Sequence, residues 1–122
     1  LDLGLARLMP SSGRPTPPGR LGAPEYLAPE RIRGGPPSVA SDIYALGVVM
    51  FELLTGKLPF QGTLDHVFDQ QLHGAIPSPS TLVDEALDER ADEIVAKATA
   101  KDPADRHADV AGFMYELRTL MN

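Results

Sequence analysis

The stretch Ser41–Thr55, with the sequence SDIYALGVVMFELLT, decides the fold of this 122-residue chain. Apolar side chains lie on nearly every face of the helix that it would form. A helix that is apolar all round is buried, so this stretch predicts the central helix of the molecule. Ser41 or Asp42 is placed to cap its start, and Gly56 is placed to end it.

Three more helices are expected further along, because apolar side chains recur there at helical spacing. The first spans residues 64–73, between a capping Thr63 and a stop signal at Gly74. The second ends before Pro103, and the third begins after a capping Asp109. Their expected apolar faces are, in chain order, Leu64, Val67, Phe68 and Leu72; Leu87, Ala91, Ile94, Val95 and Ala98; and Val110, Phe113, Met114, Leu117 and Leu120.

The first 37 residues hold eight of the twelve prolines. Residues 10–20 carry no apolar side chain apart from proline, and their Pro and Gly disfavour helix and sheet, so we expect residues 8–22 to form a mobile loop. A structureless loop of this length in a compact domain is usually functional or disordered. We find no convincing strand beyond residues 1–5, so the sequence predicts a mainly α fold with about four helices.

Charge is unevenly distributed along the chain, which has a net charge of −6. Residues 1–37 carry five bases and three acids, whereas residues 38–122 carry six bases and fourteen acids. Such an acidic bulk disfavours phosphate contacts, so we expect no nucleic-acid partner. The absence of Cys excludes disulfides and thiolate sites and fits a reducing compartment. The apolar run at residues 43–54 is too short to span a bilayer, so no membrane segment is expected in this chain.

Four short motifs occur in a fixed order. They are DLG at residues 2–4, APE at 28–30, SDIYALG at 41–47 and DPADR at 102–106. Each is weak alone, but together their order and spacing resemble the second half of a eukaryotic-like protein kinase domain. The further runs ELLTGKLPF, which starts at Glu52, and RHADV, which starts within the last motif, resemble bacterial Ser/Thr kinases most.

This resemblance implies a C-terminal-lobe portion of the protein-kinase-like fold. Residues 1–30 would form the Asp-x-Gly motif and activation segment, and residues 31–122 the helical subdomain. The chain contains no Gly-rich phosphate loop, strand Lys or His-Arg-Asp loop. Because it opens on Leu1, directly before a motif, we expect a fragment whose N-lobe and catalytic loop lie elsewhere in a longer protein.

The resemblance further implies that the longer protein transfers the γ-phosphoryl of ATP to Ser or Thr hydroxyls of a protein or peptide substrate. Asp2 would hold Mg²⁺ against the phosphates, since Mg²⁺ prefers hard oxygen ligands. Leu3 stands where the family usually has Phe, and Gly4 permits the turn that aims Asp2. We expect the isolated chain to be inactive and to bind neither ATP nor Mg²⁺ tightly. The longer protein is expected in the cytoplasm, unless segments outside this chain anchor it to a membrane.

Within the activation segment, the resemblance makes Thr16, Ser11 and Ser12 candidates for phosphorylation, which would order the loop by pairing with Arg. An unmodified loop remains the alternative. The residues implied in peptide-substrate binding are Pro24, Glu25, Tyr26, Leu27 and Glu52. For Glu52 the alternative is a helix acid that is satisfied locally.

Two further roles implied by the resemblance are structural. Glu30 and Arg106 are expected to form a buried ion pair. Asp42 is expected to brace the catalytic loop while also favouring the helix dipole. Because that loop is absent from this sequence, we expect the Asp42 carboxylate to keep bonding capacity that water or local backbone would meet.

One position departs from the family pattern. Ala23 stands where the family generally has a Thr whose hydroxyl contacts the catalytic Asp, and this keeps a pseudokinase-like interaction module open as an alternative. A small helical protein unrelated to kinases is a more remote alternative. His66, His73 and His107 show no metal-ligand spacing and are expected at the surface or its boundary.

Overall fold

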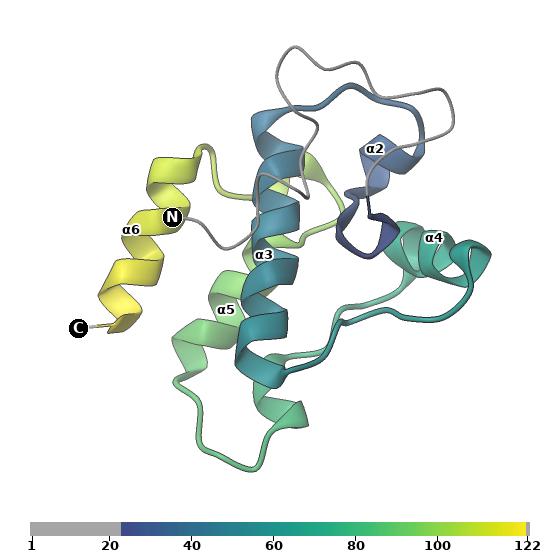
Figure 1. Ribbon diagram of the computed structural model, residues 1–122. Coiled ribbons are helices and arrows are strands. Elements are labelled where there is room, and N and C mark those ends of the chain that lie inside the picture. The colour runs from purple at the N-terminus through teal and green to yellow at the C-terminus, as the bar shows by residue number, and fades with distance from the viewer. Residues whose placement is uncertain (1–22, 122) are drawn as a thin grey trace.

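The computed structural model describes residues 23–121. Helix α3 (Val39–Thr55) runs through the middle of these residues, with α5 and α6 on one side and α2 and α4 on the other (Figure 1). In chain order the elements are η1 (Pro24–Tyr26), α2 (Pro29–Ile32), α3, α4 (Leu64–His73), η2 (Pro79–Leu82), α5 (Glu89–Ala98), η3 (Pro103–Asp105) and α6 (Val110–Met121), the η elements being 3₁₀ turns. The described part is helical and contains no strand, which confirms the predicted fold class.

The start of α3 corrects the predicted cap. Ser38, not Ser41 or Asp42, is the capping residue, and the helix begins at Val39. The Ser41 backbone N–H donates to Ser38 Oγ at 3.0 Å, and the Ser38 backbone N–H donates to Ser41 Oγ at 2.9 Å. This reciprocal capping box satisfies two otherwise unpaired donors, so the helix starts earlier than expected. The predicted end is confirmed, because Gly56 adopts a left-handed φ of 73°.

Helix α4 has the predicted bounds and the predicted Thr63 cap, but its buried face differs. Leu64 is 55% exposed, whereas Gln71 is fully buried. Gln71 can be buried because its amide is hydrogen-bonded at both ends. In the last helix, α6, the expected apolar residue Val110 is likewise 40% exposed.

The main core joins α3 to α5 and α6. It consists of Ile43, Leu46, Met50, Phe51, Ala91, Ile94, Val95, Ala98 and Phe113. Gly47 permits the close approach of α3 to the end of α5, because a Cβ at this position would lie 2.7 Å from Thr99 Cγ2 and 2.8 Å from Ala98 Cβ. A second, smaller cluster of Ala28, Tyr44 and Val48 attaches residues 24–28 to the opposite face of α3.

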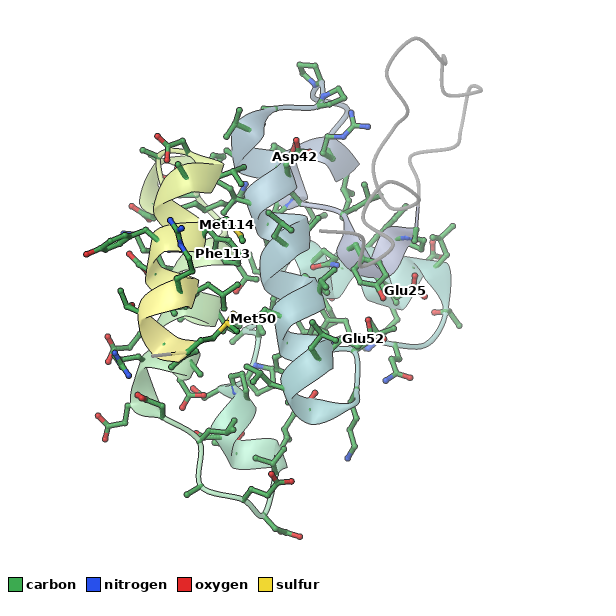
Figure 2. The ribbon with its side chains drawn as sticks, turned by 60° about the vertical axis from the view of Figure 1, so that its left-hand side comes forward. Glu25, Asp42, Met50, Glu52, Phe113 and Met114 are labelled. Carbon is green, nitrogen blue, oxygen red and sulfur yellow. The ribbon has the colours of Figure 1, made fainter. Side chains whose placement is uncertain are left out.

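Helix α3 is less completely buried than the sequence predicted. Residues 43–51 are buried, but Leu53 is 66% exposed. The C-terminal half of α3 and helix α6 border an apolar cavity of about 340 Å³, which Met50, Leu53, Phe113, Met114 and Leu117 help to line. Figure 2 shows Met50, Phe113 and Met114 between these two helices. Among residues 23–121, no helix is both long and apolar enough to cross a membrane.

Candidate functional site

The side chain of Arg106, at the end of η3, is fully buried. Its Nη1 donates to Glu30 Oε2 at 2.6 Å and its Nη2 to Glu30 Oε1 at 2.9 Å, which makes a bidentate pair. The remaining N–H groups donate to the backbone carbonyls of Ala40, Ala100 and Lys101. All five guanidinium donors are therefore used, and the contact predicted from the motifs is present.

The Glu30 carboxylate stays ionised to a lower pH than an ordinary Glu side chain does. Burial disfavours its charged form, but the hydrogen bonds and charge of Arg106 favour it, and the net effect lowers the pKa of Glu30 below its usual value. The Arg106 guanidinium carbon also lies 5.0 Å from the centroid of the Tyr44 ring, a cation–π contact. The ion pair and this stacking attach α2, and with it the preceding residues 24–28, to α3.

Four of the residues expected to bind a peptide, Pro24–Leu27, form η1 and the residue after it, and the fifth, Glu52, lies on α3. The Tyr26 hydroxyl donates to Glu52 Oε1 at 2.5 Å, although the two residues are 26 positions apart. Burial, together with this bond to the Glu52 carboxylate, raises the pKa of Tyr26 to about 12. Glu52 is therefore held by a distant partner, not by a local one. Figure 2 shows Glu25 and Glu52 on the same side of α3, so the structure brings these expected residues together.

Gln71 of α4 is a residue of this site that the sequence reasoning missed. Its Nε2 donates to Glu25 O at 2.8 Å and to Pro24 O at 3.2 Å. Its Oε1 accepts a hydrogen bond from the Tyr44 hydroxyl. The signal that could have found it is its position: Gln71 occupies a place on α4 where the helical spacing calls for an apolar side chain.

Lys101 is a second missed residue beside Tyr44. Its Nζ donates to Gln70 O at 3.2 Å and lies 5.8 Å and 5.2 Å from the ring centroids of Tyr44 and Phe60. Burial, followed by the positive charge of Arg106, lowers the pKa of Lys101 to about 8. Burial also raises the pKa of Tyr44, which stays a neutral hydrogen-bond donor.

Asp42 lies in the first turn of α3 and is partly buried. Burial raises the pKa of Asp42, and the nearby positive charge of Arg31 opposes this rise. Within residues 23–121 no side chain or backbone group donates a hydrogen bond to its carboxylate. Its bracing of a catalytic loop stays a prediction.

Several expected site residues lie outside the described part of the chain. They are Asp2, Leu3, Gly4, Ser11, Ser12 and Thr16. The expected loop at residues 8–22 and strand at residues 1–5 also fall there. Between residues 23 and 121, no three His, Asp or Glu side chains converge on a point where they could hold a metal ion. We assign the described residues no step through Mg²⁺ or ATP.

The histidines are only partly placed as expected. His66 and His73 are exposed, but His107 is buried, which corrects the prediction. His107 Nε2 pairs with Glu116 Oε1 at 2.9 Å, and its ring packs edge-on against Phe113 with the centroids 5.3 Å apart. The bond to Glu116 satisfies one ring nitrogen, whereas His107 Nδ1 is buried with no hydrogen-bond partner among the described residues.

The sequence also matches a known protein family. The sequence model of the family described as "Protein kinase domain" matches residues 1–114. The chain belongs to the protein kinase domain family. Three relatives are the serine/threonine-protein kinases PknL of Mycobacterium tuberculosis, PrkC of Bacillus subtilis and Pkn1 of Myxococcus xanthus. They are 37%, 36% and 36% identical to this chain over 120, 119 and 124 residues.

These alignments cover nearly all of this kinase chain but only part of each relative. The alignment with PknL includes 98% of the chain and 30% of the relative. The alignment with PrkC includes 97% of the chain and 18% of the relative, and that with Pkn1 includes 99% and 18%. The chain thus spans less than a third of the length of the curated relatives that it matches. The family match and the helical structure confirm the resemblance to a Ser/Thr kinase and the assignment of this chain as part of such a domain.

Proposed function

We propose that this chain is the substrate-binding, C-terminal-lobe part of a Ser/Thr protein kinase. The whole protein would transfer the γ-phosphoryl of ATP to a Ser or Thr hydroxyl of a protein substrate. Residues 1–30 would supply the Asp-x-Gly motif and activation segment, and residues 31–122 the helical support. ATP would supply the phosphoryl group and Mg²⁺ would offset its charge, and both would be bound largely by parts of the protein outside residues 23–121.

The observation that carries this proposal is the bidentate Glu30–Arg106 pair. It ties the APE motif to the DPADR motif 76 residues later and does so with a fully buried guanidinium. The pair is architectural: it sets the position of the residues just before it, Pro24–Leu27, against α3 and α4. The names of the three relatives, all kinases, support an enzyme over a module that only binds.

In the proposed reaction the described residues act on the peptide, not on the phosphates. Glu25 and Glu52 lie on one side of α3, and Tyr26 holds the Glu52 carboxylate through its hydroxyl. Both acids are partly exposed, so they can attract a basic side chain of the substrate. We propose that substrates with Arg or Lys near the phosphorylated residue are favoured.

Radiolabelled ATP and the whole protein test the proposal. We expect phosphoryl transfer to a peptide that contains Ser and Arg, and its loss in an Asp2→Ala variant that remains folded. A matched peptide with Glu in place of Arg should react more slowly. The isolated 122-residue chain should transfer no phosphoryl group above the Asp2→Ala background. A whole protein that is folded, binds ATP and still transfers nothing would favour the interaction module instead.

The position of Ala23 provides a second test of the same proposal. Ala23 precedes η1 and its backbone carbonyl accepts the Tyr26 N–H at 3.1 Å, while its methyl side chain offers no hydrogen bond. In the whole protein we expect Ala23→Thr to raise kcat, because a hydroxyl there would be available to the catalytic loop. Ala23→Val, which matches Thr in shape without the hydroxyl, should not.

Mass spectrometry of the active protein would show whether Thr16, Ser11 or Ser12 is phosphorylated.

A further inference from the structure

Gln71 is the polar residue of α4 that is completely removed from solvent. A buried primary amide costs free energy unless its donors and its acceptor are all paired. Here they are paired, and the partners come from two other segments of the chain. That arrangement needs a reason beyond packing, because a Leu or Met would fill the same place on an apolar helix face without any of these requirements.

The partners fix how the amide is turned. Two backbone carbonyls, Pro24 O and Glu25 O, lie 3.2 Å and 2.8 Å from the terminal nitrogen of Gln71. Carbonyls only accept, so the NH₂ group must face them, and the amide oxygen must face the Tyr44 hydroxyl that donates to it. Both N–H donors therefore hold the backbone of η1.

Tyr44, which orients the amide, is itself held by charged neighbours. Its ring lies under the Arg106 guanidinium, and its hydroxyl oxygen is 3.5 Å from Lys101 Nζ. Gln71 thus connects the Pro24–Glu25 backbone to the same buried cluster that contains the Glu30–Arg106 pair. The segment is held at both ends, by Gln71 at Pro24–Glu25 and by Arg106 through Glu30.

We propose that Gln71 is a positioning residue for the peptide substrate. It fixes the Pro24–Glu25 backbone and so sets where the side chains of Glu25 and Tyr26 meet the peptide. This inference rests on the proposed function, because it assigns Gln71 to the binding of that same substrate. It predicts that removing the amide weakens peptide binding while ATP binding and the chemical step change little.

Steady-state kinetics of the whole kinase test this prediction. Gln71→Met keeps the length and the apolar packing of the side chain but removes both donors. We expect a rise of about tenfold in KM for the peptide, the effect of losing roughly two neutral hydrogen bonds, with KM for ATP and kcat within about twofold. Gln70→Met is the matched control, since the Gln70 side chain makes no bond to Pro24 or Glu25. Tyr44→Phe, which keeps the ring over which Arg106 stacks, should raise the peptide KM by a smaller factor.

Hydrogen exchange in the same proteins provides a readout that does not depend on activity. The Leu27 N–H donates to Pro24 O and the Tyr26 N–H to Ala23 O, so both amides report on η1. We expect Gln71→Met to speed their exchange about tenfold and to leave the amides of α5 unchanged.

Unchanged peptide KM in a folded Gln71→Met protein would overturn the inference, as would an equal rise for Gln70→Met. If the unaltered protein transfers no phosphoryl group, the proposed function fails and the substrate role of Gln71 fails with it. Exchange then still decides whether Gln71 holds the η1 backbone, so the two failures are distinguishable.

Discussion

Replacing Glu30 with Ala should destabilise the chain strongly, because it strands a buried cation. The Arg106 side chain has no exposed surface, and two of its five donors would lose their carboxylate acceptors. Breaking a buried ion pair by removing one partner typically costs about 3–5 kcal/mol. The Glu30 side chain is 24% exposed and Arg106 keeps three carbonyl acceptors, so we expect the lower end, about 3 kcal/mol.

Urea unfolding of the 122-residue chain, followed by far-ultraviolet circular dichroism, measures this loss. In thermal unfolding the same loss should lower Tm by about 10 °C for a chain of this size. Arg90→Ala is the control, since it breaks the exposed Arg90–Asp88 pair at 2.7 Å and should change stability little. The double variant Glu30→Ala with Arg106→Met should recover part of the loss, because no buried charge remains unpaired.

A loss below about 1 kcal/mol for Glu30→Ala would refute the reasoning, provided that the helical signal is intact. It would mean that water or the three carbonyls satisfy Arg106 without the carboxylate. An equal loss of stability for Arg90→Ala would also refute the reasoning, since the cost of breaking the Glu30–Arg106 pair would then not arise from its burial.

Four other outcomes are expected. The pKa of Glu30 is lowered on folding, so its contribution to stability is present above the unfolded pKa and is lost as pH falls through the folded pKa. The free energy of unfolding, measured at pH 6 and at pH 3, should therefore fall less for Glu30→Gln than for the unaltered chain. Folding lowers the pKa of Lys101 to about 8, so above that pH the unfolded state binds more protons than the folded state. The stability of the unaltered chain should therefore rise between pH 8 and pH 10, relative to that of Lys101→Met. Tyr26→Phe removes the bond to Glu52 and should raise the peptide KM of the whole kinase more for a basic peptide than for a neutral one; equal effects on the two peptides would contradict the role given to Glu52. The 122-residue chain alone should melt below about 70 °C, because the apolar cavity between α3 and α6 is left open, and a sharp transition above that temperature would count against this expectation.

How far the sequence predicted the fold depended on whether the signals were local. Helix α4 has Thr63 at one end and Gly74 at the other, and its bounds were predicted correctly. The cap of α3 was placed three or four residues late, at Ser41 or Asp42, because Ser38 and Ser41 cap each other and either hydroxyl looks suitable from the sequence. The single turn of α2 was missed, since four residues between Ala28 and Arg33 carry no periodic pattern.

The site shows the same division between local and distant information. The Glu30–Arg106 contact was implied by the resemblance to the kinase family, since no spacing rule would join residues 76 positions apart. Gln71 was missed because its partners Pro24 and Glu25 lie 47 and 46 positions away, and only the folded chain brings them together. His107 was misplaced because its burial depends on how α6, which carries Phe113 and Glu116, packs back over it.

The many bonds of Arg106 have a consequence for the order in which the molecule is made. Synthesis proceeds at about 5–20 residues per second, so the ribosome delivers Glu30 roughly 4–15 s before the arginine that neutralises it, 76 residues later. Until then the carboxylate and the carbonyl of Ala40 lack the guanidinium that joins them in the finished molecule. The segment from Pro24 to Glu30 therefore acquires its final position only after Arg106 has been synthesised.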